Sequence, residues 1–465
     1  MTDFENFFSS MRGKNVSVIG MGISNMPLIK LLCSYGANVT VHDRQNKADD
    51  ETLNNNRLLL KTLGAEAVFG EHYLDNLSSE YIFRTPGLLP TEPKLAKAIE
   101  RGVTVSSEME LFYKLCPAKI IGITGSDGKT TTSTLIAKLL EASGHRVFLG
   151  GNIGTPLLDK IPTMSSDDFA VTELSSFQLM DMTRSPEVAV VTNVSPNHLD
   201  KHTDMNEYVD AKRNIFSHQT NNGRLVYNTE NVYTAEFAKS ARGETVGFSS
   251  KACSGCEFGL EDGYIVRRFD DGSTRRIVSR DDILLPGVHN AENYMAAIAA
   301  TEKYVTDDAI HTVATSFGGV EHRCEFVREF NGVKYYNSSI DSSPTRTIAA
   351  LSAFEQKLTV IAGGYDKKIP FDALGEPMVK KAKRLILIGA TAEKIADAVK
   401  RAEGYSPTTP EIIFSADLEA AVNCAAEVSE KGDTVILSPA CASFDSFKNF
   451  EERGQVFKKA VRRLK

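Results

Sequence analysis

The stretch KIIGITGSDGKTTTSTLIAKLL, residues 119–140, gives the clearest indication of the fold. Its first six residues are mostly apolar and predict a buried strand, and the apolar spacing after residue 130 predicts a helix. The glycines between them allow successive backbone N–H groups to face a polyphosphate, while the helix N-terminus and Lys129 add positive charge. We therefore predict a nucleotide-phosphate loop of the tight G-x-x-G-K-T form, since the longer Walker spacing would need glycine where Ile123 stands. A glycine-rich turn with a surface lysine is the alternative.

Other apolar runs also end in small, polar or charged residues. They cover residues 15–20, 169–174, 188–194, 358–362 and 434–438. In open α/β sheets, ligands bind just outside the carboxyl ends of the strands. Because these runs alternate with helical stretches, we predict an α/β fold with parallel sheets flanked by helices.

The length of 465 residues is too great for one ordinary hydrophobic core. Three blocks emerge from the pattern of strands and motifs, and each predicts one domain. We expect a Rossmann-like N-terminal domain over residues 1–106, a central P-loop ATPase-like domain with a parallel sheet over residues 107–318, and a C-terminal Rossmann-like domain over residues 319–465.

The composition excludes several classes of protein. The net charge is −7 and no basic stripe is visible, which argues against a nucleic-acid partner. No run approaches the ~18 apolar residues of a membrane span, and residues 1–14 carry early acids and no long apolar core, unlike a secretory signal. The seven scattered cysteines suit a reducing compartment. We expect a cytoplasmic protein that works as a monomer.

Two residues after the phosphate loop, Glu173 and His198, are candidates for metal binding or catalysis. Glu173 ends an apolar strand, where a carboxylate is a plausible Mg²⁺ ligand; a solvated acid near a helix N-cap is the alternative. His198 follows another strand, with Asp200 near it, and is a candidate for a metal or substrate contact, whereas His202 is expected at the surface. The spacing around Lys212 shows only an ordinary helix face.

The first block carries half of a dinucleotide fingerprint in residues 20–25. Its third glycine position holds Asn25, and Asp43 ends the next strand at about the distance of a ribose or base contact. We expect a nucleotide or nucleotide-sugar site there. Further along the chain, Asn290 could cap an alanine-rich helix and Asn293 could meet an adenine edge.

These motifs, in this order, resemble those of the Mur ligase family, and the resemblance covers nearly the whole chain. The segments that carry it are GSDGKTT, ELSSFQ, NVSPNHLD, YVDAKRNIF, GVHNAEN, EHRCEF and SPACASFDSFKNFEERG. The last is the most discriminating and is similar to the branch of the family that adds D-glutamate. The resemblance implies ATP-dependent ligation of D-glutamate to UDP-N-acetylmuramoyl-L-alanine through an acyl phosphate, in cytoplasmic peptidoglycan precursor synthesis.

The resemblance also implies roles for individual residues. Lys129, His198 and Lys212 would be catalytic. ATP would contact Gly125, Ser126, Asp127, Gly128, Lys129, Thr130, Thr131, Asn290, Asn293 and Arg323. One Mg²⁺ would bind Thr130 and Glu173, and a second would bind His198 and Lys212 as a carbamate. The UDP-linked substrate would contact Ser24, Asp43, Arg44, Thr85, Pro86, Gly87 and Asn152, and D-glutamate would contact Lys367, Ser443 and Phe444.

The sequence departs from the family pattern at two places. The family often has an acid after the first asparagine of the third domain's first loop, whereas Ser338 follows Asn337 here. We expect Asp341 to supply the missing acid. The family role of Ser342 is expected only if Asp341 does so. Asn197 precedes His198 where an acid is common.

Other functions stay open at this point. The chain shows no nucleophile elbow and no Ser-His-Asp arrangement, so an ATP site points to activation of the substrate itself. A Mur-type ligase for another amino acid, or a folylpolyglutamate synthase, would look similar. A P-loop kinase or regulatory ATPase is the alternative from another class. A nicotinamide dehydrogenase is the third alternative, and Asn25 in place of the third fingerprint glycine argues against it.

Overall fold

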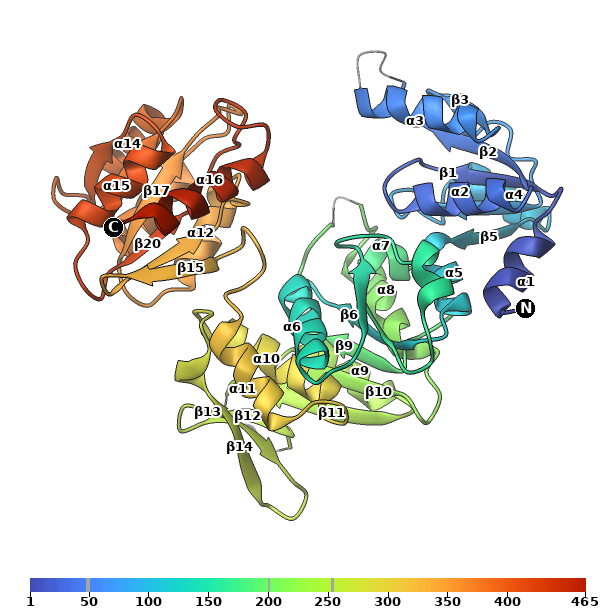
Figure 1. Cartoon of the computed structure of the whole chain (residues 1–465), viewed down its shortest axis with the longest axis horizontal. Coiled ribbons are helices and arrows are strands. Elements are labelled where there is room, and N and C mark those ends of the chain that lie inside the picture. The colour runs from blue at the N-terminus through green and yellow to red at the C-terminus, as the bar shows by residue number, and fades with distance from the viewer. Residues whose placement is uncertain (47–50, 200, 252–254) are drawn as a thin grey trace. The chain divides into compact units, whose positions relative to one another are not determined.

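The computed structural model describes residues 1–46, 51–199, 201–251 and 255–465. It is an α/β structure with three sheets, as the sequence predicted (Figure 1). Residues 1–277 with 292–310 form one compact unit, and residues 278–291 with 311–465 form the other. The domain boundaries at residues 106/107 and 318/319 stay predictions.

The first sheet is parallel and has the strand order β3-β2-β1-β4-β5. Val16 and Val18 of β1 pack in the core that includes Leu28 of α2, whereas Ile82 of β4 packs with Leu95 of α4. Helices therefore cover both faces of this sheet. Its elements are α1 (Asp3–Ser10), β1 (Asn15–Ile19), α2 (Asn25–Ser34), β2 (Asn38–Asp43), α3 (Glu51–Thr62), β3 (Glu66–Phe69), β4 (Tyr81–Arg84), α4 (Pro93–Glu100) and β5 (Thr104–Ser107).

The second sheet has nine strands in the order β14-β13-β12-β11-β10-β9-β6-β8-β7. The predicted parallel sheet is correct for β6 to β12, and β13 extends it by pairing antiparallel with β12. Strands β8 and β9 are buried along their whole length, as parallel strands covered on both faces are. The strands are β6 (Lys119–Thr124), β7 (Val147–Gly151), β8 (Phe169–Glu173), β9 (Val188–Val191), β10 (Arg224–Asn228), β11 (Glu244–Ser249), β12 (Phe258–Glu261), β13 (Tyr264–Arg268) and β14 (Thr274–Ser279).

Helices and short 3-10 turns accompany this sheet, and three of them position the candidate site. Helix α6 begins directly after the phosphate loop, α7 lies just beyond β8, and α8 packs against both α7 and β6. The helical elements are α5 (Glu108–Leu115), α6 (Lys129–Ala142), η1 (Leu158–Thr163), α7 (Ser176–Leu179), α8 (Met205–Ser217), α9 (Val232–Ser240), η2 (Arg280–Asp282), α10 (Val288–Thr301) and α11 (Asp307–Ser316).

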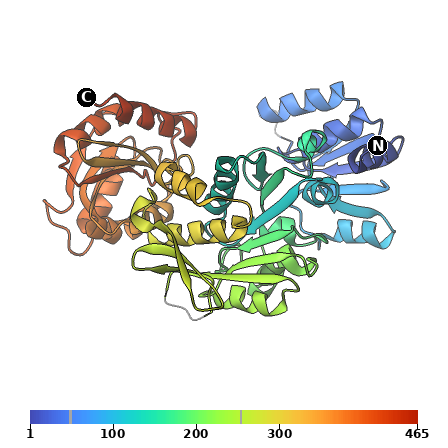
Figure 2. The same ribbon diagram turned by 60° about the horizontal axis from the view of Figure 1, so that its bottom comes forward.

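The third sheet has the order β15-β16-β20-β17-β18-β19, and only the β15–β16 pair in it is antiparallel. Successive residues of β17 point to opposite faces of the sheet: Val360 packs with α12 to α14, and Ile361 packs with α15 and α16. Helices therefore lie on both faces, as Figure 2 shows. The elements are β15 (Glu325–Phe330), β16 (Val333–Asn337), α12 (Pro344–Ser352), β17 (Leu358–Gly363), α13 (Asp372–Lys381), β18 (Ala382–Ile388), α14 (Ala392–Arg401), β19 (Glu411–Phe414), α15 (Leu418–Val428), β20 (Thr434–Leu437) and α16 (Phe450–Arg463).

The structure confirms every strand whose carboxyl end the sequence marked as a candidate site, with ends differing by at most a few residues. Among the described residues, no helix combines the length and the apolar character needed to cross a membrane.

Candidate active site

The phosphate loop lies between β6 and α6, and its two glycines take backbone conformations that other residues rarely adopt. Gly125 has φ +149° and Gly128 has φ +80°. A β-carbon on Gly125 would lie 1.9 Å from Thr192 Oγ1, and one on Gly128 would lie 2.5 Å from Asn293 Oδ1. The loop therefore needs both glycines, as a backbone that curls around phosphate does.

The segment that follows β9 holds this loop in place. The N–H groups of Ser126 and Asp127 donate to Asn193, at 2.9 Å each, and Thr192 Oγ1 donates to the Asp127 carbonyl at 2.6 Å. No local sequence pattern marks Thr192 or Asn193, because their role depends on the neighbouring position of β6 and β9 in the sheet. The loop is thus shaped before any ligand arrives.

Ser126 is also anchored through its hydroxyl group. Its Oγ lies 2.9 Å from the Ser195 carbonyl and 2.9 Å from the Tyr208 hydroxyl, and the Ser195 N–H donates to it at 2.9 Å. The side chain of Ser126 is therefore engaged within the protein, and a direct contact of this residue with ATP stays a prediction.

Two lysines share one carbonyl at the loop. Lys129 Nζ and Lys212 Nζ each donate to the Gly125 carbonyl at 2.8 Å. Lys212 is 2% exposed, and its Nζ also lies 3.4 Å from Thr124 Oγ1 and 4.6 Å from the Tyr208 ring centroid. Burial, and then the neighbouring Lys129 ammonium, lower the pKa of Lys212 to about 7. Lys129 thus supplies the positive charge for phosphate at this turn, whereas Lys212 loses much of its charge near neutral pH.

The expected Mg²⁺ ligands Thr130 and Glu173 lie together. Thr130 Oγ1 donates to Glu173 Oε2 at 2.8 Å, and Asn152 Nδ2 donates to Glu173 Oε1 at 2.9 Å. Glu173 ends β8, which is the neighbour of β6, so the carboxylate faces the start of α6. A buried carboxylate and a hydroxyl beside a phosphate loop form a donor set that suits Mg²⁺.

The candidate His198 is exposed, in a left-handed conformation with φ +55°, and its ring meets Phe177 edge-on at 5.4 Å between centroids. The neighbouring Asp200 lies outside the described residues.

The expectation that His202 is a surface residue is wrong. This side chain is buried, stacks on Phe177 at 4.9 Å and lies 2.9 Å from Ser176 Oγ through Nε2, and burial lowers its pKa.

At the carboxyl edge of the first sheet, the structure brings together several of the residues expected to bind the UDP-linked substrate. The Asp43 carboxylate accepts the Met21 N–H at 3.0 Å, and a β-carbon on Gly20 would lie 3.0 Å from the Thr85 β-carbon. Asn25, in the third glycine position of the fingerprint, is buried and donates to the Gly20 carbonyl at 3.0 Å. The other candidates of this group are Ser24, directly before α2, exposed Arg44, and Pro86 and Gly87 in the turn after β4.

In the second unit, the three residues expected at D-glutamate lie at the ends of β17 and β20. Lys367 Nζ is 6.0 Å from the Phe444 ring centroid, and Phe444 is exposed, whereas Ser443 is buried.

Asn290 is the third residue of α10 and donates to the Pro286 carbonyl at 2.6 Å, so it does not cap the helix. Arg323 is exposed in the turn before β15.

The first loop of the third sheet keeps its acid at Asp341. This carboxylate is buried and accepts the Ser438 hydroxyl at 2.8 Å, and the Asp341 N–H donates to the Ser338 carbonyl at 3.0 Å. Burial raises the pKa of Asp341 to about 6. Asp341 and Ser338 thus lie in one turn; the compensation by Asp341 and a role for Ser342 stay predictions.

Protein-family models match three successive parts of the chain, and known proteins match nearly its whole length. The Mur ligase MurD-like N-terminal domain matches residues 14–107, the Mur ligase middle domain residues 123–301, and the Mur ligase glutamate ligase domain residues 322–441. A protein of Acetivibrio thermocellus named UDP-N-acetylmuramoylalanine–D-glutamate ligase is 51% identical over 99% of this chain and 98% of its own. The protein of the same name from Clostridium perfringens is 45% identical over 99% of both chains.

Solved structures show a similar fold at low identity. A UDP-N-acetylmuramoyl-L-alanyl-D-glutamate–2,6-diaminopimelate ligase has a TM-score of 0.58 at 17% identity and covers 98% of this chain and 93% of its own. A UDP-N-acetylmuramate–alanine ligase from Thermotoga maritima has a TM-score of 0.55 at 16% identity, with coverage of 97% and 99%.

Proposed function

The chain belongs to the Mur ligase family, and from this premise we propose that it joins D-glutamate to UDP-N-acetylmuramoyl-L-alanine with hydrolysis of ATP to ADP and phosphate. The observation that carries the proposal is the 51% identity to a relative of that name over 99% of the chain. The phosphate loop with its two lysines, close to Glu173, supplies the ATP chemistry that such a ligation needs.

ATP binding is assigned to the loop and its neighbours. The N–H groups of residues 128–131 at the N-terminus of α6 would hold the phosphates, with Gly125, Ser126 and Asp127 lining the loop, and Lys129 would leave the Gly125 carbonyl to pair with the phosphate charge. Asn293 supports this arrangement, because its amide lies against Gly128 and accepts the Thr132 hydroxyl at 3.2 Å. Asn290 and Arg323 are assigned to ATP by family resemblance.

Two Mg²⁺ ions are part of the proposal. Thr130 and Glu173 would hold the first, and their 2.8 Å contact supports this. His198 and a carbamate formed from the Lys212 amine and CO₂ would hold the second. Bound Mg²⁺ would neutralise the phosphate charge and orient the γ-phosphate for transfer.

The substrates are assigned to the carboxyl ends of strands in all three sheets. The UDP part would contact Ser24, Asp43, Arg44 and the turn 85–87, and Asn152 would reach the muramoyl-peptide part. Lys367, Ser443 and Phe444 would bind D-glutamate, whose two carboxylates suit an ammonium and a hydroxyl donor.

The reaction would proceed in two steps. The carboxylate of the L-alanyl substrate attacks the γ-phosphorus of ATP, which breaks the bond to ADP and gives an acyl phosphate. The neutral amine of D-glutamate then attacks the acyl carbon, loses a proton, and expels phosphate. Lys129 stabilises the charge that develops on the transferred phosphoryl group, and the rigid loop holds the phosphates in line with the attacking oxygen.

We place the reaction in the cytoplasm, as a step of peptidoglycan precursor synthesis in bacterial cell-wall formation, carried out by a monomer. Cys33, Cys116, Cys324, Cys424 and Cys441 in the described part of the chain are free thiols, which suits a reducing compartment. Light scattering on the purified protein would test the monomer.

The choice of amino acid is tested by competition. Purified protein receives Mg²⁺-ATP, UDP-N-acetylmuramoyl-L-alanine and an equimolar mixture of D-glutamate, L-alanine and diaminopimelate, and the products are separated by mass. The proposal predicts the D-glutamate adduct almost alone. A dominant adduct of another amino acid would reassign the chain within the family, and a phosphorylated substrate without adduct would favour a kinase.

A further inference from the structure

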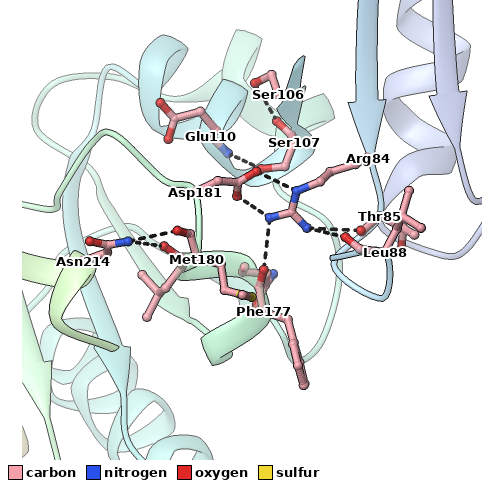
Figure 3. Close-up of polar contacts among 12 residues, drawn as sticks. Arg84, Thr85, Leu88, Ser106, Ser107, Glu110, Phe177, Met180, Asp181 and Asn214 are labelled. Carbon is pink, nitrogen blue, oxygen red and sulfur yellow. Dashed lines mark hydrogen bonds and ion pairs between the residues drawn. The ribbon is translucent and has the colours of Figure 1, made fainter. Parts of the chain in front are cut away.

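Residues 177–183 form a junction in the first unit, where α7 and the chain after it meet three other elements. This segment begins four residues after Glu173, the proposed Mg²⁺ ligand at the end of β8. Figure 3 shows polar contacts reaching it from β4 and α8, and Glu110 of α5 also contacts it. The contacts from β4 come from one side chain, Arg84.

Arg84 is 1% exposed, and all five of its N–H groups have acceptors. Its fork pairs with both oxygens of Asp181, with Nε at 2.6 Å from Oδ2, and Nη2 also donates to the Phe177 carbonyl at 3.2 Å. On the other side, Nη1 donates to the carbonyls of Thr85 at 3.3 Å and Leu88 at 3.0 Å. One buried guanidinium therefore ties two segments that lie more than ninety residues apart.

Arg84 donates hydrogen bonds to the turn formed by residues 85–88. This turn includes residues 85–87, which the proposed function assigns to the UDP-linked substrate. The Leu88 N–H closes this turn on the Thr85 carbonyl at 3.1 Å, so Arg84 and the turn hydrogen bond use the same acceptor. The carbonyls of Thr85 and Leu88 point to the Arg84 guanidinium (Figure 3).

The other two contacts connect the junction to the phosphate side. Asn214 of α8 donates through Nδ2 to the carbonyls of Leu179 at 2.9 Å and Met180 at 3.2 Å, and it lies two residues after Lys212. Glu110 of α5 accepts the N–H and hydroxyl of Thr183 at 3.1 and 2.6 Å. The junction thus connects the turn, the helix of Lys212 and the strand of Glu173.

We propose that Arg84 is a positioning residue for the UDP-linked substrate. It sets the place of the turn 85–88 relative to Glu173 and Lys212, so that the carboxylate of the bound substrate meets the γ-phosphate. This inference rests on the proposed function. An arginine is required because its planar fork can serve five acceptors in fixed directions, whereas a lysine offers three donors from a single nitrogen atom.

The test compares Arg84→Lys and Arg84→Met with a matched control, Arg224→Met. Arg224 is also buried and paired with a carboxylate, that of Glu302, but it begins β10 at the amino edge of its sheet, away from the strand ends that form the site. The KM for UDP-N-acetylmuramoyl-L-alanine, the KM for ATP, kcat, and the thermal midpoint by circular dichroism are measured for each. Calorimetric binding of the UDP-linked substrate gives a readout independent of turnover.

We expect Arg84→Lys to raise the KM and the dissociation constant of the UDP-linked substrate by about tenfold or more, because sub-ångström misplacement of a binding turn has effects of that order. The KM for ATP should stay within about twofold, since the loop contacts are untouched. The control should lower the thermal midpoint and leave both KM values unchanged. Should Arg84→Met not fold, Asp181→Asn serves as the second variant, because it keeps the shape and removes the charge that pairs with Arg84.

An Arg84→Lys protein that melts earlier but keeps both KM values overturns the inference and leaves Arg84 with a purely structural role. Equal increases in the KM for ATP and for the UDP-linked substrate also overturn it. If the wild type neither binds nor ligates UDP-N-acetylmuramoyl-L-alanine, the proposed function fails and the inference with it. If the wild type ligates the substrate and the Arg84 variants have unchanged KM values, the inference fails while the proposed function stands.

Discussion

Replacing Gly125 by alanine probes the phosphate loop most sharply. The new β-carbon would lie 1.9 Å from Thr192 Oγ1 and 3.1 Å from the Asn193 carbonyl oxygen. Thr192 cannot rotate away freely, because its hydroxyl donates to the Asp127 carbonyl at 2.6 Å and its side chain is 4% exposed. The substitution therefore forces either the loop or its support to move.

The expected cost combines two terms. A non-glycine residue at φ +149° adds backbone strain of about 1–3 kcal/mol. Overpacking against a buried, hydrogen-bonded neighbour adds about 1–3 kcal/mol. The sum, about 2–6 kcal/mol, is large beside the ~5–15 kcal/mol that stabilises an ordinary protein. We expect part of it to be relieved by a shift of the loop, which would lower kcat/KM for ATP about a hundredfold.

The assay pairs Gly125→Ala with Gly144→Ala as a control. Gly144, just beyond α6, also has a positive φ of +87°, but nothing lies within 4 Å of the β-carbon it would gain. The chain contains no tryptophan, so unfolding is followed by circular dichroism and ATP binding by calorimetry. Gly144→Ala should lose about 1–2 kcal/mol through strain alone and keep its turnover. If Gly125→Ala matched this control in both stability and kcat/KM, the loop geometry described above would be refuted.

Four further predictions concern single side chains. Lys129→Ala should lower kcat/KM for ATP by about 10²–10³-fold with an unchanged circular dichroism spectrum, because phosphate charge is no longer stabilised; near wild-type turnover would remove the loop from the mechanism. Glu173→Gln should raise the Mg²⁺ concentration for half-maximal turnover at least about tenfold, which a magnesium titration checks, and an unchanged requirement would exclude this carboxylate as a ligand. Lys212→Met keeps a long side chain but removes the amine, so turnover should be lost while calorimetric binding of ADP persists; an active Lys212→Met protein would exclude the proposed carbamate. Glu108 is buried, its Oε1 has no partner within the described chain, and burial raises its pKa to about 8. The free energy of unfolding of the wild type should therefore fall relative to that of Glu108→Gln by about 1.4 kcal/mol per pH unit between pH 4.5 and 8, and a constant difference between the two proteins across that range would contradict this.

The pH dependence follows from the sign of the shift. A carboxyl whose pKa is higher in the folded state binds its proton more tightly there, so its contribution is fully present below pH 4.5 and disappears as the pH passes about 8. Glu108→Gln removes the ionisation and should therefore be the more stable protein at pH 8.

The sequence alone predicted the six strands that precede the candidate sites, because buried parallel strands leave continuous apolar runs and ligand sites follow them. Residues 119–124 were placed as a strand without error, and the loop with Lys129 and Thr130 was identified from local spacing. Glu173 was proposed as a Mg²⁺ ligand because it ends such a run, and this role stays a prediction. These signals are local, so no tertiary structure was needed to read them.

Residues whose role depends on packing between distant segments could not be read in this way. Lys212 looks like any lysine on a helix face, and only the packing of α8 against β6 buries it beneath the loop. His202 was expected at the surface, yet the chain folds it against Phe177 and Ser176. Arg84 shows no motif at all, since its five acceptors come from segments that the sequence does not connect.

The most direct test of the account is phosphate release by the purified protein with Mg²⁺-ATP and UDP-N-acetylmuramoyl-L-alanine, with and without D-glutamate, together with the mass of the product. The account predicts steady release only when both substrates are present, with one added glutamate for each phosphate released. Steady release that does not depend on D-glutamate, or dependence without a joined product, would contradict it.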